Sequence, residues 1–137
     1  MKLAVGSDEK TALTDLVVGE LKKRGHQVEL FGPLEGEPMG WPDVGEKVAL
    51  EVSQGRADQG ILFCWTGTGV TIAANKIPGV RAALCWDSET AKGARLWDDA
   101  NVLAMSLRST SPAMAKEILD AWFLSQPVTT GIDAELI

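Results

Sequence analysis

Short apolar segments alternate with longer amphipathic segments along the whole of this 137-residue chain. Several of the short segments are continuous hydrophobic runs, such as "ILF" and "VLAM", which are typical of strands covered on both faces. The expected strands are Lys2–Gly6, Gln27–Leu30, Gly60–Cys64, Arg81–Cys85 and Asn101–Met105. The alternation predicts a doubly wound α/β domain, in which a mostly parallel five-stranded sheet lies between two layers of helices.

The segments between these strands carry helix signals. Leucine and valine recur at helical spacing in the first of them, and Pro112 stands at the first position of the last, where its missing N–H costs nothing. The expected helices are Thr11–Arg24, Pro42–Gln54, Ser88–Trp97 and Ser111–Leu124. The Pro/Gly-rich stretch Phe31–Pro42 is predicted to be one long loop. Residues 1–137 are expected to form a single domain, with Pro127–Ile137 as a loosely held tail.

The composition excludes several classes of function. Charged residues make up 23% of the chain, the net charge is −6, and the basic residues are scattered, whereas nucleic-acid binding needs a basic face. No apolar run approaches the roughly 18 residues of a membrane span, and the N-terminus lacks the apolar core of a signal peptide. We therefore expect a cytoplasmic protein that binds neither nucleic acid nor membrane.

The chain has two cysteines and one histidine, and their spacing matches no zinc motif. We therefore expect no metal and no cofactor. Cys85 ends an apolar run and is predicted to be a core residue. His26, in a turn between a helix and a strand, is expected to be exposed and structural.

Ligands of open parallel sheets bind outside the carboxyl ends of the strands. Cys64 lies at such an end and is followed by "TGTG" (Thr66–Gly69), where a helix is expected to begin. Read by itself, this loop is equally a tight turn between strand and helix. However, N–H groups at a helix start favour a thiolate and attract anions. A nucleophilic cysteine would normally need a histidine partner. Proton transfer by Cys64, with Thr66 and the loop N–H groups holding an oxyanion, is chemically easier.

The residues also resemble a known family, the ribose-5-phosphate isomerase B family, which includes galactose-6-phosphate isomerase. The family motif GSDHAG is similar to "GSDEKT" at the end of the first strand, and its Y-P-D turn to "WPD" at Trp41–Asp43. Its C-G-T-G-x-G-x-x-I-A-A-N-K is similar to "CWTGTGVTIAANK", and H-N-D-x-N-V-L to "WDDANVL" at Trp97–Leu103. The resemblance covers about Met1 to Phe123, and the combined order and spacing are highly specific.

The resemblance implies a Rossmann-like three-layer sandwich and a homodimer, or a dimer of dimers, whose active sites are shared between subunits. It implies a metal-free aldose–ketose interconversion of a sugar or sugar phosphate through a cis-enediolate. Cys64 would be the base, and Thr66 would assist. Some relatives use a Glu just after the loop instead, but that position is Val70 here. The expected substrate-binding residues are Asp8, Glu9, Trp65, Gly67, Thr68, Gly69, Trp97, Asp98 and Arg108, with Asp8 on sugar hydroxyls and Arg108 on the phosphate.

The chain departs from the family pattern at functional positions. Trp97 replaces the ring-opening His and Asp98 the Asn beside it, while Glu9 replaces the His of GSDHAG and Trp65 the Gly after the cysteine. The tail "TTGIDAELI" has no basic residue, although arginines there bind phosphate in the family. Glu9 and Asp98 would also repel a phosphate dianion.

Three explanations of these departures remain open. The expected one is an isomerase with an altered substrate, such as a short open-chain sugar phosphate, whose pocket Trp65 and Trp97 narrow. The second is a sugar-binding relative that has lost catalysis. The third is ordinary ribose-5-phosphate isomerase activity, with Asp98 or Asp99 assisting ring opening. Hydrolysis through a Cys64 thioester is a more distant alternative.

Overall fold

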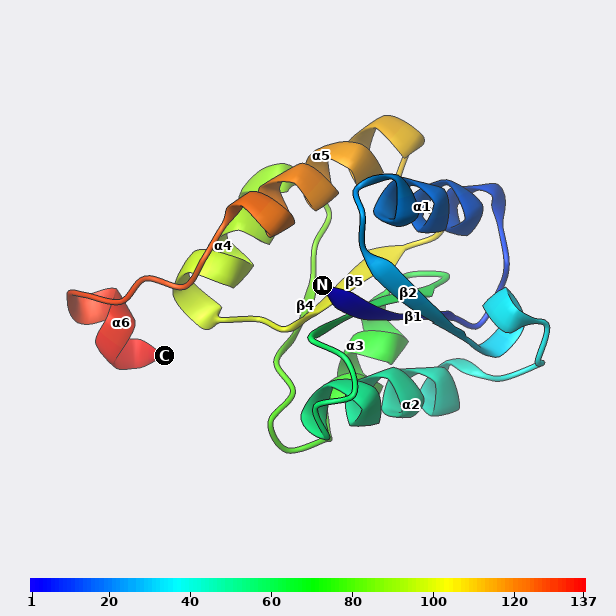
Figure 1. Ribbon diagram of the computed structural model, residues 1–137, viewed down its shortest axis with the longest axis horizontal. Coiled ribbons are helices and arrows are strands. Elements are labelled where there is room, and N and C mark those ends of the chain that lie inside the picture. Colours follow the sequence, from blue (N-terminus) through cyan, green and yellow to red (C-terminus); the bar gives the residue numbers. More distant parts are fainter.

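The computed structural model describes residues 1–137. Helices and strands alternate along the chain: β1 Lys2–Ser7, α1 Ala12–Lys23, β2 Gln27–Phe31, the 3₁₀ turn η1 Gly32–Glu35, α2 Trp41–Ser53, β3 Gln59–Cys64, α3 Thr68–Asn75, β4 Ala82–Leu84, α4 Ser88–Asp98, β5 Val102–Ser106, α5 Pro112–Leu124 and α6 Ile132–Leu136. The strands form one sheet in the order β2-β1-β3-β5-β4, and every pair is parallel. Helices α1, α4 and α5 cover one face, and α2 and α3 cover the other (Figure 1). The predicted α/β three-layer sandwich is confirmed.

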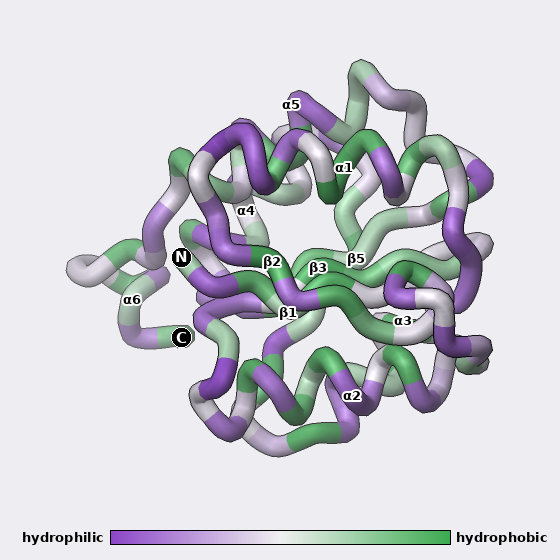
Figure 2. The backbone as a smooth tube through the Cα atoms, turned by 45° about the vertical axis from the view of Figure 1, so that its right-hand side comes forward, coloured by the Kyte–Doolittle hydropathy of each residue, from purple (hydrophilic) through white to green (hydrophobic).

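The central strands are apolar because helices cover both of their faces. All six residues of β3 are buried, and the tube through β1, β3 and β5 is mostly hydrophobic in Figure 2. Successive side chains of β3 point to opposite faces. Phe63 therefore packs in the core beneath α1, α4 and α5, whereas Leu62 and Cys64 pack in the core beneath α2 and α3.

Side-chain caps fix the starts of three helices. At α1, the Thr11 hydroxyl accepts a hydrogen bond from the Thr14 backbone N–H at 3.2 Å, and Thr14 Oγ1 accepts one from the Thr11 N–H at 2.9 Å. The Asp87 carboxylate accepts a hydrogen bond from the Thr90 N–H at the start of α4, and the Ser111 hydroxyl accepts one from the Met114 N–H at the start of α5. Each cap satisfies an N–H group that the helix itself leaves unpaired.

Two predicted segments differ from the structure. The prediction of one long loop over Phe31–Pro42 is wrong, because η1 lies within it and α2 already begins at Trp41. Gly32 has a left-handed φ of 68°, which starts η1, and the buried Leu34 anchors this turn to the core. Strand β4 is also shorter than the expected Arg81–Cys85, since only Ala82–Leu84 pairs with β5.

The C-terminal tail extends beyond the three layers and ends in α6, which lies beside α4 (Figure 1). The Val128 backbone N–H donates to the Leu96 carbonyl at 3.0 Å, and this bond ties the tail to α4. Helix α6 buries none of its residues, and its apolar side chains Ile132 and Leu136 are exposed. No helix in the molecule combines the length and the apolar character that a membrane crossing would need.

Candidate active site

Three neighbouring strands bring polar residues to the carboxyl edge of the sheet. Asp8 follows β1, Cys64 ends β3 and Ser106 ends β5. In the sheet register, Ser7 lies beside Phe63, and Cys64 lies beside Ser106. Since neighbouring strands are about 4.8 Å apart, the backbones of these three residues lie side by side within about 10 Å along this edge of the sheet.

The loop between β3 and α3 makes its turn at Gly67, whose φ is 79°. A Cβ atom at this position would lie 2.5 Å from Leu84 Cδ1 and 3.0 Å from the carbonyl carbon of Met105. Glycine is therefore required both for the left-handed conformation and for the close approach to β4 and β5. The Thr71 hydroxyl donates to the Gly67 carbonyl at 2.7 Å and holds the turn from α3.

The same loop leaves backbone donors free. The N–H groups of Trp65, Thr66, Gly67 and Gly69 form no hydrogen bond within the protein. The N–H of Thr68 has only a long contact of 3.4 Å with Thr66 Oγ1. Because these donors lie at a helix start, the loop can hold a negatively charged oxygen.

The end of β5 anchors the loop. The Ser106 hydroxyl donates to the Trp65 carbonyl at 2.9 Å, and the Arg108 N–H donates to the same oxygen at 3.0 Å. The Leu107 N–H donates to the Cys64 carbonyl at 2.9 Å. These bonds engage the carbonyls on one side of the loop, so its N–H groups remain available to a ligand.

A cavity of about 320 Å³ adjoins this loop, and its walls are Asp8, Trp41, Cys64, Trp65, Thr66, Thr68 and Gly69. Cys64 is only 4% exposed but forms part of the wall, whereas the Trp65 side chain projects to solvent and is 60% exposed. The indole that replaces glycine in the family motif therefore does not fill the turn. The Thr66 and Thr68 hydroxyls lie 2.7 Å apart and form one polar corner of the cavity.

Asp8 is the only carboxylate in the cavity wall. Burial raises the pKa of Asp8 above its ordinary value of 3.8; a backbone hydrogen bond opposes the shift, and the neighbouring Glu9 charge adds to it. A carboxyl group in this environment can exchange hydrogen bonds with sugar hydroxyls in either protonation state. In contrast to Asp8, Glu9 is exposed and is not part of the wall.

The structure places the predicted site residues in three groups. Six of them, Asp8, Cys64, Trp65, Thr66, Thr68 and Gly69, share the cavity. Glu9, Gly67 and Arg108 lie at the same edge of the sheet but outside the cavity wall. Trp97 and Asp98 lie at the other end of the sheet, where the Asp98 carbonyl accepts a hydrogen bond from Arg81 Nε, just before β4 begins.

Trp97 and Asp98 line a separate hollow of about 450 Å³ on the outer surface of α4. The Trp97 indole lies against Gly93, one turn earlier, and is 55% exposed. Within one copy of the chain, these two residues therefore cannot contact a ligand at Cys64.

The environment of His26 differs from the prediction. The prediction of an exposed His26 is not accurate, because its ring is half-buried and stacks on Phe123 at 4.6 Å between centroids. Burial, aided by the nearby N-terminal charge, lowers the pKa of His26.

Trp41 lines the cavity but was not among the predicted binding residues. The Trp-Pro-Asp motif, which resembles the family's Y-P-D turn, is the signal in the sequence that could have identified it.

Comparison with known proteins gives a consistent result. The family model described as Ribose/Galactose Isomerase matches residues 3–135. The chain is 42% identical over 123 residues to the Ribose-5-P isomerase B of Listeria innocua, covering 89% of this chain and 83% of that protein. It is 36% identical over 125 residues to the D-erythrulose-4-phosphate isomerase of Pectobacterium atrosepticum, covering 89% and 82%.

Among solved structures, ribose-5-phosphate isomerase B of Clostridium thermocellum superposes with a TM-score of 0.90 at 41% identity, covering 98% of this chain and 91% of that one. Sequence and structure thus agree over nearly the whole chain. The chain belongs to the ribose/galactose isomerase family.

Proposed function

We propose that this chain interconverts an aldose phosphate and a ketose phosphate, and that the Cys64 thiolate is the base that moves a proton between two neighbouring carbons. Interconversion of aldoses and ketoses is the reaction class of its family. One observation carries the assignment of the base. Cys64 lines a cavity whose adjoining wall is a loop with free backbone N–H groups.

The proposed reaction has two proton transfers at carbon. The thiolate takes the proton from C2 of the aldose, the C–H electron pair forms the C1–C2 double bond, and the carbonyl oxygen becomes negative. The resulting enediolate is held by the N–H groups of the loop from Trp65 to Gly69. The Cys64 thiol then returns the proton to C1, and the hydroxyl proton on O2 passes to O1, which completes the ketose.

Thr66 and Asp8 assist this reaction from the cavity wall. The Thr66 hydroxyl, in contact with Thr68 Oγ1 at 2.7 Å, can take the proton from O2 of the substrate while giving its own proton to O1. Asp8 binds the hydroxyls farther along the sugar. Arg108, whose backbone is bonded to Trp65, lies at the same edge and binds the phosphate as an exposed cation.

A second copy of the chain completes the site in this proposal. Trp97 and Asp98 are expected to contact the substrate, but they lie at the opposite end of the sheet from Cys64. They can reach a substrate only in another copy, so we propose a homodimer with shared sites. The exposed Trp97 side chain fits this role, since exposed tryptophan is typical of interface centres.

We further propose that the substrate is shorter than ribose 5-phosphate. The C-terminal tail, Pro127–Ile137, has no basic residue that could bind the phosphate of a longer sugar. One relative is named for erythrulose 4-phosphate, a four-carbon sugar. A four-carbon sugar phosphorylated on O4 has no free hydroxyl that could close a five-membered ring. It therefore needs no ring-opening group, and Trp97 can stand where the family has histidine.

The proposal is tested by incubating the purified protein with four-, five- and six-carbon aldose and ketose phosphates and following product formation by NMR. We expect turnover, with the highest kcat/KM for the four-carbon pair. Binding that raises the melting temperature without any turnover would instead favour the sugar-binding alternative. Highest activity on ribose 5-phosphate would contradict the shorter substrate and leave the reaction class intact.

The shared site is tested by mixing two inactive variants, Cys64→Ala and the double variant Trp97→Ala/Asp98→Ala. If each site combines residues of both copies, hybrid dimers contain one site with all of its native residues. Refolding the two variants together should then restore about a quarter of wild-type activity, by the statistics of random pairing. No recovery in hybrids that demonstrably form would refute the shared site, while each variant refolded alone serves as the control.

A further inference from the structure

The indole of Trp41 packs directly against the backbone of the anion-binding loop. A Cβ atom built on Gly69 would lie 2.8 Å from both Cδ2 and Cε3 of Trp41 and 3.3 Å from Cε2. These are atoms of the fused part of the ring, so the face of the indole covers the Gly69 Cα. Gly69 does not have a positive φ. Glycine is therefore needed at this position for close approach and not for an unusual backbone conformation.

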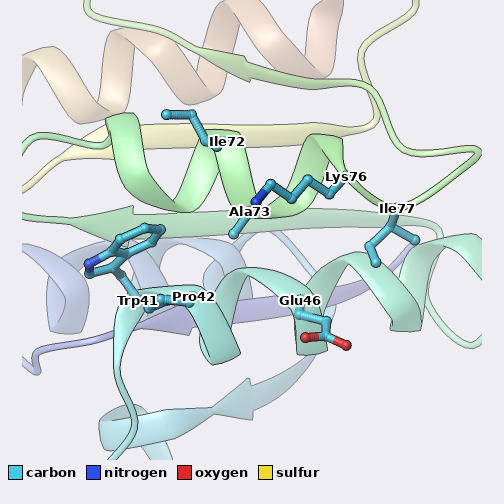
Figure 3. Close-up of a pocket in the computed structure, with 7 residues that line it drawn as sticks. All are labelled: Trp41, Pro42, Glu46, Ile72, Ala73, Lys76 and Ile77. Atoms are coloured by element: carbon cyan, nitrogen blue, oxygen red, sulfur yellow. The ribbon is translucent and has the colours of Figure 1, made fainter.

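Trp41 also separates the catalytic cavity from a second hollow. An apolar groove of about 380 Å³ lies between α2 and α3, and its walls are Trp41, Pro42, Glu46, Ile72, Ala73, Lys76 and Ile77. Figure 3 shows Trp41 and Pro42 at the start of α2, with the remaining apolar side chains on and after α3. Trp41 is the only residue that lines both hollows. It is only partly buried, with 42% of its surface exposed.

The loop has few other fixed contacts on this side. Helix α3 has no side-chain cap at its start, and the Gly69 N–H forms no hydrogen bond within the protein. Side chains of α3 and β5 hold the carbonyls of Gly67 and Trp65, which lie earlier in the loop. Gly69 is the second residue of α3, and the three atoms nearest to its Cβ position all belong to the indole, so Trp41 is the side chain that bounds Gly69 on the side of α2.

Building on the proposed function, we propose that Trp41 is a positioning residue, which acts on the reaction through Gly69 by setting where the loop N–H groups point. A displacement of about 1 Å in such a site can cost roughly 100-fold in rate. Because the enediolate depends on these donors more than the bound sugar does, the loss should appear in kcat and not in KM.

The first test is steady-state kinetics of Trp41→Ala and Trp41→Phe. We expect kcat to fall about 30-fold or more in Trp41→Ala, with KM within about threefold, and to return to within about fivefold of wild type in Trp41→Phe. Ile72→Ala is the matched control, because Ile72 lines the groove but not the cavity. An unchanged kcat in Trp41→Ala, or an equal loss in Ile72→Ala, would overturn the proposal.

The second test asks whether Trp41 acts through Gly69. In Gly69→Ala the new methyl group meets the indole, so we expect a similar loss of kcat. In the double variant Trp41→Ala/Gly69→Ala the obstacle is absent, so the double variant should be no slower than the slower single variant. Gly19→Ala is the control, since a Cβ there meets no atom within 4 Å. Multiplied losses in the double variant would show that the two residues act independently.

The third test does not depend on catalysis, so it separates this proposal from the proposed function. Iodoacetamide labelling followed by mass spectrometry reports the accessibility of each thiol. Because Trp41 and Cys64 line the same cavity, Cys64 should be labelled at least about tenfold faster in Trp41→Ala than in wild type. The buried Cys85 should remain protected. Equal acceleration at both thiols would indicate general loosening and refute a local role. If wild type shows no turnover but this labelling pattern is observed, the proposed isomerase function is refuted and the contact of Trp41 with the loop is still supported.

Discussion

Strands β3 and β4 each deliver a cysteine to the carboxyl edge of the sheet, but only one of the two thiols meets a cavity. Cys64 ends β3 and is 4% exposed, and Cys85 follows β4 and is 1% exposed. They face opposite sides of the sheet. Cys64 packs in the core beneath α2 and α3, whereas Cys85 packs in the core beneath α1, α4 and α5.

The residues that follow each cysteine make the difference. After Cys64, the Gly/Thr loop keeps its N–H groups free and leaves a cavity. After Cys85, Asp87 uses its carboxylate to cap α4 through the Thr90 N–H at 2.8 Å. Burial, and to a lesser extent the Asp87 charge, raises the pKa of Cys85 to about 12. A thiol at a strand end is thus available for chemistry only where the following backbone leaves both space and donors.

The largest effect that distinguishes the two cysteines is expected in catalysis. Cys64→Ala should reduce kcat by about 10²- to 10⁴-fold, the usual contribution of a general base. Cys85→Ala should leave kcat within about threefold and lower stability by about 1–2 kcal/mol, since it removes buried volume. Steady-state kinetics and urea unfolding of both variants check this. A loss of kcat in Cys85→Ala equal to that in Cys64→Ala would contradict the claim that only Cys64 takes part in catalysis.

A smaller effect is expected in the alkaline stability of the protein. The pKa of Cys85 is about 12 in the folded protein, against 9.0 for a free thiol, so the unfolded chain loses this proton first. The folded state therefore holds more protons between these values, and stability falls as pH rises through that window. The contribution of Cys85 is about 1.4 kcal/mol per pH unit.

Urea unfolding of wild type and Cys85→Ala at several pH values above 9 measures this contribution. Titration of lysines affects both proteins, so the difference between their slopes isolates Cys85. We expect the variant to lose stability more slowly as pH rises. Parallel slopes would mean that the Cys85 thiol ionises as readily in the folded protein as in the unfolded chain.

The sequence predicted the architecture well because its signals are local. Continuous apolar runs marked the buried strands, and Pro112 marked the start of α5 correctly. The turn η1 escaped prediction, because a Pro/Gly-rich composition does not reveal that Leu34 is anchored in the core. The extent of β4 was overestimated, since the end of a short strand depends on its partner and not on its own apolar residues.

In the candidate site, too, the contacts between residues close in sequence could be predicted, whereas those that depend on tertiary packing could not. Cys64, Thr66 and Gly69 are close in sequence, so their shared cavity could be anticipated from one motif. The contact of Trp41 with Gly69 arises from the packing of α2 on α3 and has no local signature. The distance between Trp97 and Cys64 likewise follows from the direction of α4, and it becomes visible only once the chain is folded.

The most direct test of the account is hydrogen exchange at carbon in heavy water. The protein is incubated with a ketose phosphate that it turns over, and deuterium at C1 is followed by proton NMR. We predict exchange at C1 in wild type and in Cys85→Ser, and none above the uncatalysed rate in Cys64→Ser. Exchange at the wild-type rate in folded Cys64→Ser would show that another group moves the proton.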